Sequence, residues 1–275
     1  ASAQLSQNAA SSWHRRPAIA QQLFGCADLI LAVDADQKQH FINLGAEASG
    51  VHVGGSLKMT TASLSIDADL QAPIRTASSK RAIFLAASTH ESEDEAAIAV
   101  ARQHGDKILT IIAPRHPERA DTIAAMAHKS LGQAIPQRSK DQKPDSKTAL
   151  YILDSLGEMG SVFDIADVVF LGGSLVPKGG HNPLEPASFG VPIITGPHIF
   201  KNENEFGALA ACDIIHMIDR PDDLGAMVTS VLTFDSRKKQ RQAKAAKNYV
   251  ESARQRPLEA ARMIFALVNA KAVDR

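Results

Sequence analysis

Short apolar runs alternate with helix-like segments along almost the whole chain, and this alternation restricts the possible folds more than any other feature. Strands separated by helices are typical of parallel sheets that are buried on both faces. The sequence therefore predicts an α/β fold with a Rossmann-like, doubly wound parallel sheet. The predicted strands are 28–33, 51–54, 81–87, 107–113, 149–153, 168–171, 191–195 and 214–218. The predicted helices are 34–44, 91–104, 117–131, 157–165, 183–189, 202–211 and 221–233, followed by two C-terminal helices that separate before Pro257.

Composition excludes several classes of function. Apolar residues make up 44% and charged residues 22% of the 275 positions, which is ordinary for a globular protein. Basic and acidic residues cancel at 30 each, so the net charge does not support nucleic acid as a partner. No apolar run reaches the about 20 residues that a transmembrane helix needs. Cys26 and Cys212 show no metal-type spacing, and we expect two buried thiols in a reducing compartment.

Residues 56–79 are rich in Ser, Thr, Ala and Asp without clear periodicity, and they predict a linker. This linker divides the chain into a small N-terminal piece, 1–62, and a Rossmann-like domain, 63–275. The chain begins inside a helix-like region with no leading strand, so we expect further sequence before Ala1 in the same protein. The polar segment 139–147 predicts an exposed loop within the second domain.

Four polar segments directly follow predicted strands. Ligands of open α/β sheets bind outside the carboxyl ends of the strands, so these segments are the candidate site. If the strands are parallel, all four segments meet at one crevice. They are 88–91 (STHE), 114–118 (PRHPE), 154–158 (DSLGE) and 172–182 (GGSLVPKGGHN).

The last of these segments leads into a predicted helix that starts at Asn182. Loop amides and a helix N-terminus attract phosphate, and the Glu185 carboxylate can accept hydrogen bonds from ribose hydroxyls. The run Asn182-Pro183-Leu184-Glu185 is also a capping-box pattern that needs no ligand. The glycine-rich loop favours binding, since a cap does not require one. Asn182 can serve both roles, whereas the Glu185 carboxylate must serve one or the other.

The remaining motifs have equally plain alternatives. Arg115 suits a phosphate or carboxylate, unless it is a surface residue paired with Glu118. His116 is a weaker candidate, and the 88–90 segment could simply cap the helix that follows. Lys58 is by default a solvated charge in the linker, and it gains a role only if the linker lines a cleft.

Three further patterns have a bearing on function: a D-x-D motif, the spacing of the glycine-rich loop and a basic run near the C-terminus. The D-x-D at 34–36 could hold a metal, but Asp34 as a helix cap with Gly45 ending that helix is the favoured interpretation. The loop at 172–180 lacks both the P-loop ending and the dinucleotide-binding spacing. The basic run 237–247 is either a solvated helix face or a contact for anionic lipid headgroups.

Taken together, these motifs resemble the 3-deoxy-D-manno-octulosonic acid (Kdo) transferase family. The resemblance runs from about Gln4 to the C-terminal helices, and the GGHNPLEP block is its most specific part. The motifs that carry it, in order, are GSLK (55–58), AASTHE (86–91), PRHPER (114–119), GGSLVPKGGHNPLEP (172–186) and GPH (196–198).

The resemblance implies a GT-B glycosyltransferase with two Rossmann-like domains. Such an enzyme moves Kdo from the donor CMP-Kdo to a lipid A precursor at the cytoplasmic face of the inner membrane, and it uses no metal or other cofactor. By the same resemblance, Lys58 is the transition-state stabiliser. The implied CMP contacts are Pro114, Arg115, Leu156, Gly157, Glu158, Asn182, Pro183, Leu184 and Glu185, with His116 and Ser174 as weaker candidates.

The chain differs from the family pattern at one position, and it is expected to lack one residue of the family's active site. Leu156 stands where the family usually has Met. The general base of the family, a glutamate near the start of the N-terminal domain, is expected to lie outside this chain, so 1–62 would be a remnant of the acceptor domain and the isolated chain would not turn over. The alternatives are another GT-B enzyme with a UDP-sugar donor, or a nucleotide-binding fragment without activity.

Overall fold

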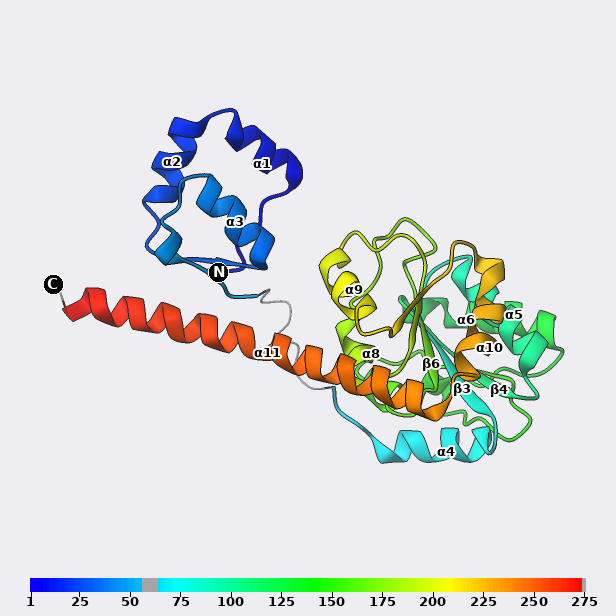
Figure 1. The fold of residues 1–275 in the computed structure, drawn as a ribbon. Helices are drawn as coiled ribbons and strands as arrows, with labels where there is room; N and C mark the ends of the chain where they lie inside the picture. Colours follow the sequence, from blue (N-terminus) through cyan, green and yellow to red (C-terminus); the bar gives the residue numbers. More distant parts are fainter. Residues whose placement is uncertain (56–63, 274–275) are drawn as a thin grey trace. The chain divides into compact units, whose positions relative to one another are not determined.

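The computed structural model describes residues 1–55 and 64–273. By their internal contacts, these residues form two compact units, one made of 1–62 with 250–275 and one made of 63–249 (Figure 1). Lys58 lies outside the described residues. Within the described chain, no helix is both long and apolar enough to cross a membrane.

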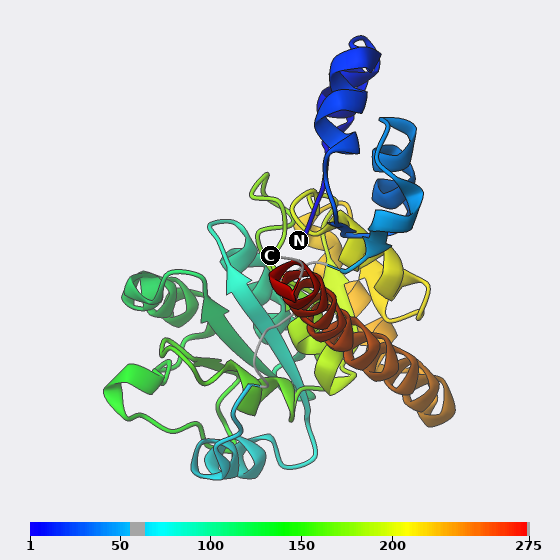
Figure 2. The same cartoon turned by 90° about the vertical axis from the view of Figure 1, so that its left-hand side faces the viewer.

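The larger unit contains a six-stranded sheet in which every neighbouring pair is parallel. The strand order is β5-β4-β3-β6-β7-β8, and Figure 2 shows β3, in cyan, in the middle of the unit. The strands are β3 (Ala82–Thr89), β4 (Ile108–Pro114), β5 (Leu150–Ile152), β6 (Val168–Leu171), β7 (Ile193–Thr195) and β8 (Ile215–Met217). The predicted doubly wound parallel sheet is confirmed.

The chain reverses its direction of travel across this sheet between β3 and β6. From β3 it moves outward to β4 and β5, returns to place β6 beside β3, and then moves outward on the other side to β7 and β8. Ligands of such sheets bind at the carboxyl ends of the strands at this switch point. The segments that follow β3 and β6 therefore hold the position where a ligand is expected.

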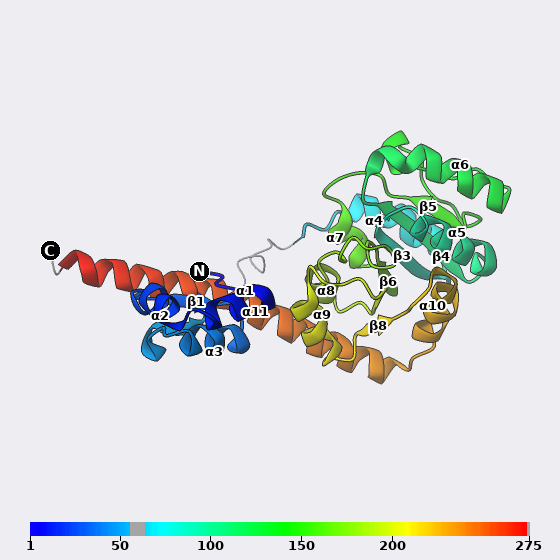
Figure 3. The same ribbon diagram turned by 90° about the horizontal axis from the view of Figure 1, so that it is seen from above.

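Helices cover both faces of the sheet (Figure 3). On one face, α5 (Glu93–His104), α6 (Ala120–Leu131) and α10 (Leu224–Leu232) share a single hydrophobic core with the strands. On the other face lie α4 (Ala68–Ser78), α7 (Met159–Phe163) and α8 (Leu184–Phe189), which contact one another in the order α4, α7, α8. The strands between these layers are buried on both sides, as their continuous apolar sequences require.

The smaller unit contains a two-stranded parallel sheet, β1 (Ile30–Ala32) with β2 (Val51–Val53). Its helices are α1 (Gln7–His14), α2 (Pro17–Gly25) and α3 (Ala35–Asn43). The Asp34 carboxylate accepts a hydrogen bond from the Gln37 amide at 2.7 Å and so caps α3. The capping interpretation of the D-x-D motif is confirmed, and Gly45, with φ +101°, follows the end of this helix.

Three expectations about local structure are wrong. The predicted linker contains α4, whose buried positions include polar Gln71 and Ser78, and this hides the helical period in the sequence. The C-terminal region is one helix, α11 (Ser236–Val273), which continues through Pro257 because proline removes only one backbone donor from a run of strong helix formers. Cys26 is exposed and Cys212 is half-buried, so neither thiol is buried as expected.

Candidate functional site

The segments after β3, β4 and β6 meet at the carboxyl edge of the sheet. The Gly172 amide donates to the Ala87 carbonyl at 2.8 Å, and the Arg115 amide donates to the Thr89 carbonyl at 3.0 Å. Strands β3 and β4 each run beyond their predicted ends, to Thr89 and Pro114. Three of the four strand-end segments therefore lie side by side at the carboxyl edge of the sheet, as predicted, and we call this place the crevice.

Glu93 at the start of α5 holds the glycine-rich loop in place. Its side chain is fully buried, and its carboxylate accepts hydrogen bonds from the amides of His90, Gly173, Ser174 and Leu175 at 2.8–3.0 Å. A carboxylate that accepts several backbone amides occupies the position that an anionic ligand takes in a phosphate-binding loop. These loop amides are therefore not free to bind a phosphate, contrary to the expectation from the sequence.

Ser174 is also committed to internal structure. Its hydroxyl donates to the Leu171 carbonyl at 2.7 Å and accepts from the Gly196 amide at 2.8 Å, and the residue is fully buried. Its carbonyl accepts from the His198 amide at 2.9 Å. The weaker prediction for Ser174 thus corresponds to a residue that joins the glycine-rich loop to the Gly196–His198 turn.

Three histidines lie over this loop. The rings of His90 and His181 are nearly parallel, at 9°, with centroids 5.7 Å apart but Nε2 atoms only 3.5 Å apart. The rings therefore face each other through their nitrogen edges and share a hydrogen bond, and they are not stacked face to face. His116 meets His90 edge-on at 5.9 Å. A methyl group on Gly173 would lie 3.2 Å from the His181 ring, and the backbone there has φ +68°, so glycine is favoured next to this pair.

The surroundings of the histidine pair are positively charged. Burial lowers the pKa of His181 to about 4, and the nearby charge of Arg115 contributes to this shift, as do His90 and Lys201. Burial also lowers the pKa of His90, with Lys178 among the further contributors. Arg115, Lys178 and Lys201 are exposed and have no carboxylate partner among the described residues.

The acids near this cluster are already used. Glu118 lies 3.6 Å from the Nδ1 atom of His116, and not beside Arg115 as one interpretation expected. Asp94 is fully buried and pairs with Arg119, and burial raises the pKa of its carboxyl. The crevice therefore has an excess of positive charge that an anionic ligand would balance.

The Asn182–Glu185 segment divides its two predicted roles between its polar residues. The Asn182 side chain accepts from the amide of Leu184, the first residue of α8, at 3.1 Å, one position before the N-cap residue Pro183, and so satisfies a donor at the helix start. Pro183 and Leu184 are buried at the start of that helix. The Glu185 carboxylate makes no hydrogen bond or ion pair within the described part of the chain, and burial raises its pKa. Glu185 is thus not used by a capping box and remains available to a ligand.

The fourth strand-end segment lies at the edge strand β5. Leu156 is 84% exposed, and Gly157 has φ +83° with open space around it. Glu158 forms a two-point ion pair with Arg138, with a shortest distance of 2.9 Å, and also bonds to Ser155. Its carboxylate is therefore already paired within the protein.

Known proteins identify the family of this chain. A family model described as 3-deoxy-D-manno-octulosonic-acid transferase (kdotransferase) matches residues 1–61. A 3-deoxy-D-manno-octulosonic acid transferase from Haemophilus influenzae is 35% identical over 208 residues, which cover 73% of this chain and 48% of that protein. The crystal structure of the C-terminal CMP-Kdo binding domain of WaaA from Acinetobacter baumannii has 29% identity and a TM-score of 0.58, and it covers 66% of this chain and 94% of that one. The chain belongs to the Kdo transferase family.

As a Kdo transferase family member, the chain has a GT-B type fold. Anabaena HepE, solved in complex with UDP-glucose, has 12% identity and a TM-score of 0.50, which supports the shared fold alone. The chain spans about half the length of the curated Kdo transferases that it matches.

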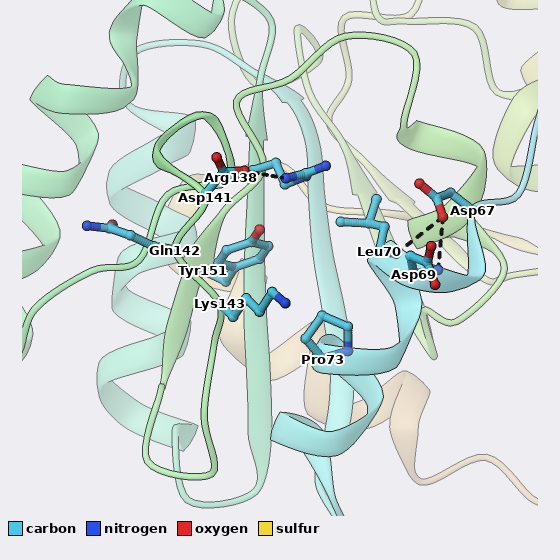
Figure 4. Close-up of a pocket in the computed structure, with 9 residues that line it drawn as sticks. All are labelled: Asp67, Asp69, Leu70, Pro73, Arg138, Asp141, Gln142, Lys143 and Tyr151. Atoms are coloured by element: carbon cyan, nitrogen blue, oxygen red, sulfur yellow. Dashed lines mark hydrogen bonds and ion pairs between the residues drawn. The ribbon is translucent and has the colours of Figure 1, made fainter.

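A separate cavity of this Kdo transferase chain, with a volume of about 430 Å³, lies between α4 and the segment 138–143 (Figure 4). Arg138 lines it and also pairs with Glu158, so it joins the cavity to one of the predicted CMP contacts. Tyr151 from β5 forms its inner wall, and burial raises the pKa of that phenol to about 12. None of the lining residues comes from the glycine-rich loop or from the segment after β4.

The sequence names Arg115, Asn182 and Glu185 as site residues, which stays a prediction, but it does not reveal the side-chain contacts that organise the crevice. Glu93 belongs to an acidic first turn that is typical of any helix N-terminus, so its sequence gives no sign of burial. His90 and His181 are 91 positions apart, and their pairing depends on β3 and β6 being neighbours. The described residues contain no group of three or more His, Cys, Asp or Glu arranged to hold a metal ion.

Proposed function

We propose that this chain binds CMP-Kdo as the donor part of a Kdo transferase, which moves Kdo to a lipid A precursor in lipopolysaccharide synthesis. The observation that carries the proposal is the unpaired positive charge beside the histidine pair, at the carboxyl edge of the sheet near the β3–β6 switch point, in a chain of this family. The CMP-Kdo ligand is named for the related Acinetobacter baumannii domain. The lipid A acceptor and the cytoplasmic face of the inner membrane are part of the proposal through the family resemblance.

Two side chains are suited to hold the CMP group. The Arg115 guanidinium directly follows β4 and is exposed without a carboxylate partner among the described residues, so its planar fork can bind a phosphate at two points. The Glu185 carboxyl group lies half-buried at the first turn of α8, where it can accept hydrogen bonds from ribose hydroxyls. Pro114 and the buried Pro183–Leu184 pair fix the backbone on either side of these groups.

The proposed chemistry is displacement at the anomeric carbon of Kdo. A hydroxyl of the acceptor attacks this carbon and passes its proton to the glutamate general base that the family resemblance implies, while the bond from the carbon to the phosphate oxygen breaks and CMP leaves with the bonding electrons. Arg115, and Lys58 outside the described residues, would balance the negative charge that develops on the phosphate. No metal or other cofactor is part of the proposal.

A calorimetric titration with CMP tests the site. We expect saturable binding, and we expect Arg115→Ala to weaken it about 10- to 100-fold, because hydrogen bonds between charged groups are lost. Arg102→Ala, at an exposed position on α5, is the matched control. Absence of saturable heat, or equal affinity in Arg115→Ala, would contradict the proposal.

Glu185→Gln separates ligand binding from folding. Because burial raises the pKa of this carboxyl group, its charged form is unfavourable in the folded protein, and the substitution should not lower the free energy of unfolding. We expect weaker CMP binding in a protein that unfolds normally. Competition between CMP and UDP addresses the alternative of a UDP-sugar donor, and tighter binding of UDP would favour it.

A further inference from the structure

Arg115 alone does not account for the positive charge of the crevice. Lys178 lies within the glycine-rich loop, and Lys201 follows the Gly196–His198 turn, so these two cations come from different segments than Arg115. Neither lysine has a carboxylate partner within the described chain. Arg115 and Lys201 therefore act on the half-buried His181 and Lys178 on the half-buried His90, three positive charges in all, whereas the phosphate of a CMP ester supplies one negative charge.

The two lysines are placed by the same loop that Glu93 holds. The Lys201 amide donates to the Gly179 carbonyl at 3.1 Å, and the Gly180 amide donates to the Gly173 carbonyl at 2.8 Å. A methyl group on Gly179 would lie 2.7 Å from Cγ of Lys201, so the lysine stem packs directly on this glycine. The position of the Lys201 side chain is thus fixed by backbone contacts, although its ammonium group is free.

Both ammonium groups act on the histidine pair. Lys201 is among the charges that disfavour protonation of His181, and Lys178 is among those that disfavour protonation of His90. Geometry agrees, because Lys178 directly precedes Gly179, against which the Lys201 stem packs, and Gly180 bonds to Gly173 next to His181. Glu93 and Asp94 do not neutralise the lysines, because Glu93 is bound to loop amides and Asp94 to Arg119, and burial disfavours the charged form of the unpaired Glu185 carboxyl group.

We propose that Lys178 and Lys201 form a second anion subsite, which binds the carboxylate of the sugar acid while Arg115 binds the phosphate. The inference rests on the proposed function, since it assigns the sugar end of the same donor. It makes the two lysines specificity-determining residues, which favour a donor with an acidic sugar over the bare nucleotide. A nucleoside diphosphate would present a similar second negative charge, and the experiment therefore includes UDP.

The test measures the affinities of the full chain for CMP, CMP-Kdo and UDP by calorimetry. We expect CMP-Kdo to bind more tightly than CMP, and we expect Lys178→Gln and Lys201→Gln each to weaken CMP-Kdo about three- to tenfold, with CMP changed less than twofold. The double variant should remove most of the preference for CMP-Kdo. Lys129→Gln, an exposed lysine on α6, is the matched control.

The outcomes separate this inference from the proposed function. CMP binding that depends on Arg115, together with a CMP-Kdo preference that the lysine variants leave unchanged, overturns the carboxylate subsite alone. Variants that weaken UDP as much as CMP-Kdo while CMP is unaffected assign the lysines to a second phosphate and also overturn it. Absence of CMP binding to the unsubstituted chain overturns both. Because both lysines are exposed, unchanged thermal unfolding of the variants is expected and excludes misfolding as the cause.

Discussion

The loop after the central strand β6 and the loop after the edge strand β5 belong to the same sheet. They differ in the number of hydrogen bonds that fix them to the rest of the protein. In the loop after β6, the buried Glu93 carboxylate accepts hydrogen bonds from three loop amides, and the Ser174 hydroxyl accepts one from the Gly196 amide of the next turn. In the loop after β5, Asp154 and Glu158 at the two ends of the segment are held by Ser139 and Arg138, whereas Leu156 is exposed and Gly157 has open space around it. The comparison indicates that the backbone of the glycine-rich loop is fixed by internal bonds, whereas Leu156 and Gly157 have few contacts that restrict them.

Removal of the Glu93 carboxylate should have the largest effect, because the glycine-rich loop would lose the group that holds it. Glu93→Ala leaves four buried amides without their acceptor, and we expect a loss of about 3–5 kcal/mol in the free energy of unfolding. Urea unfolding measures it. Glu95→Ala, at an exposed position in the same helical turn, should change stability by less than about 0.5 kcal/mol. Equal stability of the two variants would show that the carboxylate does not hold the loop.

A methyl group at the start of the same loop should have the next largest effect. In Gly172→Ala the new Cβ would lie 2.5 Å from the Ser88 carbonyl oxygen, which is backbone and cannot move away easily. We expect destabilisation by about 2–3 kcal/mol through overpacking. We also expect weaker CMP binding, because β3 and β6 would have to separate at the crevice. Denaturant unfolding and CMP titration of the same preparation check both, and normal CMP affinity would contradict the assigned position of the site.

The histidine pair should make the stability of this region depend on pH. His181 has a folded-state pKa of about 4, below its ordinary value, so the unfolded chain binds a proton that the folded chain does not. Stability should therefore fall as the pH drops from about 6.5 to 4, by about 1–2 kcal/mol after allowance for partial exposure. His181→Gln should flatten this part of the profile, and His128→Gln, at an exposed position on α6, should not.

The smallest effect is expected at the loop after β5. Gly157→Ala introduces no clash, because nothing lies within 4 Å of the new methyl group, but the backbone has φ +83°. The cost should be about 1 kcal/mol, which is the usual penalty for a left-handed non-glycine residue. Thermal unfolding measures it, and a cost as large as that of Gly172→Ala would show that this loop is packed against other parts of the protein.

The sequence was sufficient for the sheet but not for the contacts that shape the crevice. Apolar runs bounded by polar residues or glycine predicted β6 at its observed limits, and the strand-end rule correctly placed Arg115 and the glycine-rich loop at the carboxyl edge of the sheet. Helix α4 was missed because its buried face includes polar Gln71, whose amide donates to the Ser161 carbonyl at 2.8 Å. A partner 90 positions away cannot be inferred from local periodicity.

The candidate site shows the same limit. The capping role of Asn182 was predictable because it depends on residues that are adjacent in the chain. The role of Glu93 was not, because it depends on the pairing of β3 with β6, which brings residues 80 to 82 positions away to its carboxylate. The single long helix α11 differs from its prediction for a local reason, since one proline weakens a helix without always ending it.

The nitrogen-to-nitrogen contact between His90 and His181 also fixes where hydrogens can reside. A neutral imidazole carries one N–H group, and only one of the two Nε2 atoms can hold the hydrogen between them. The ring that donates from Nε2 must therefore present a bare Nδ1 lone pair, and the ring that accepts must present an Nδ1–H group. If the central hydrogen moves from one ring to the other, the Nδ1 atom of the first ring must gain a hydrogen and the Nδ1 atom of the second ring must lose one. The pair thus has two tautomeric states of opposite polarity, and a ligand that hydrogen-bonds to either outer nitrogen would select one of them.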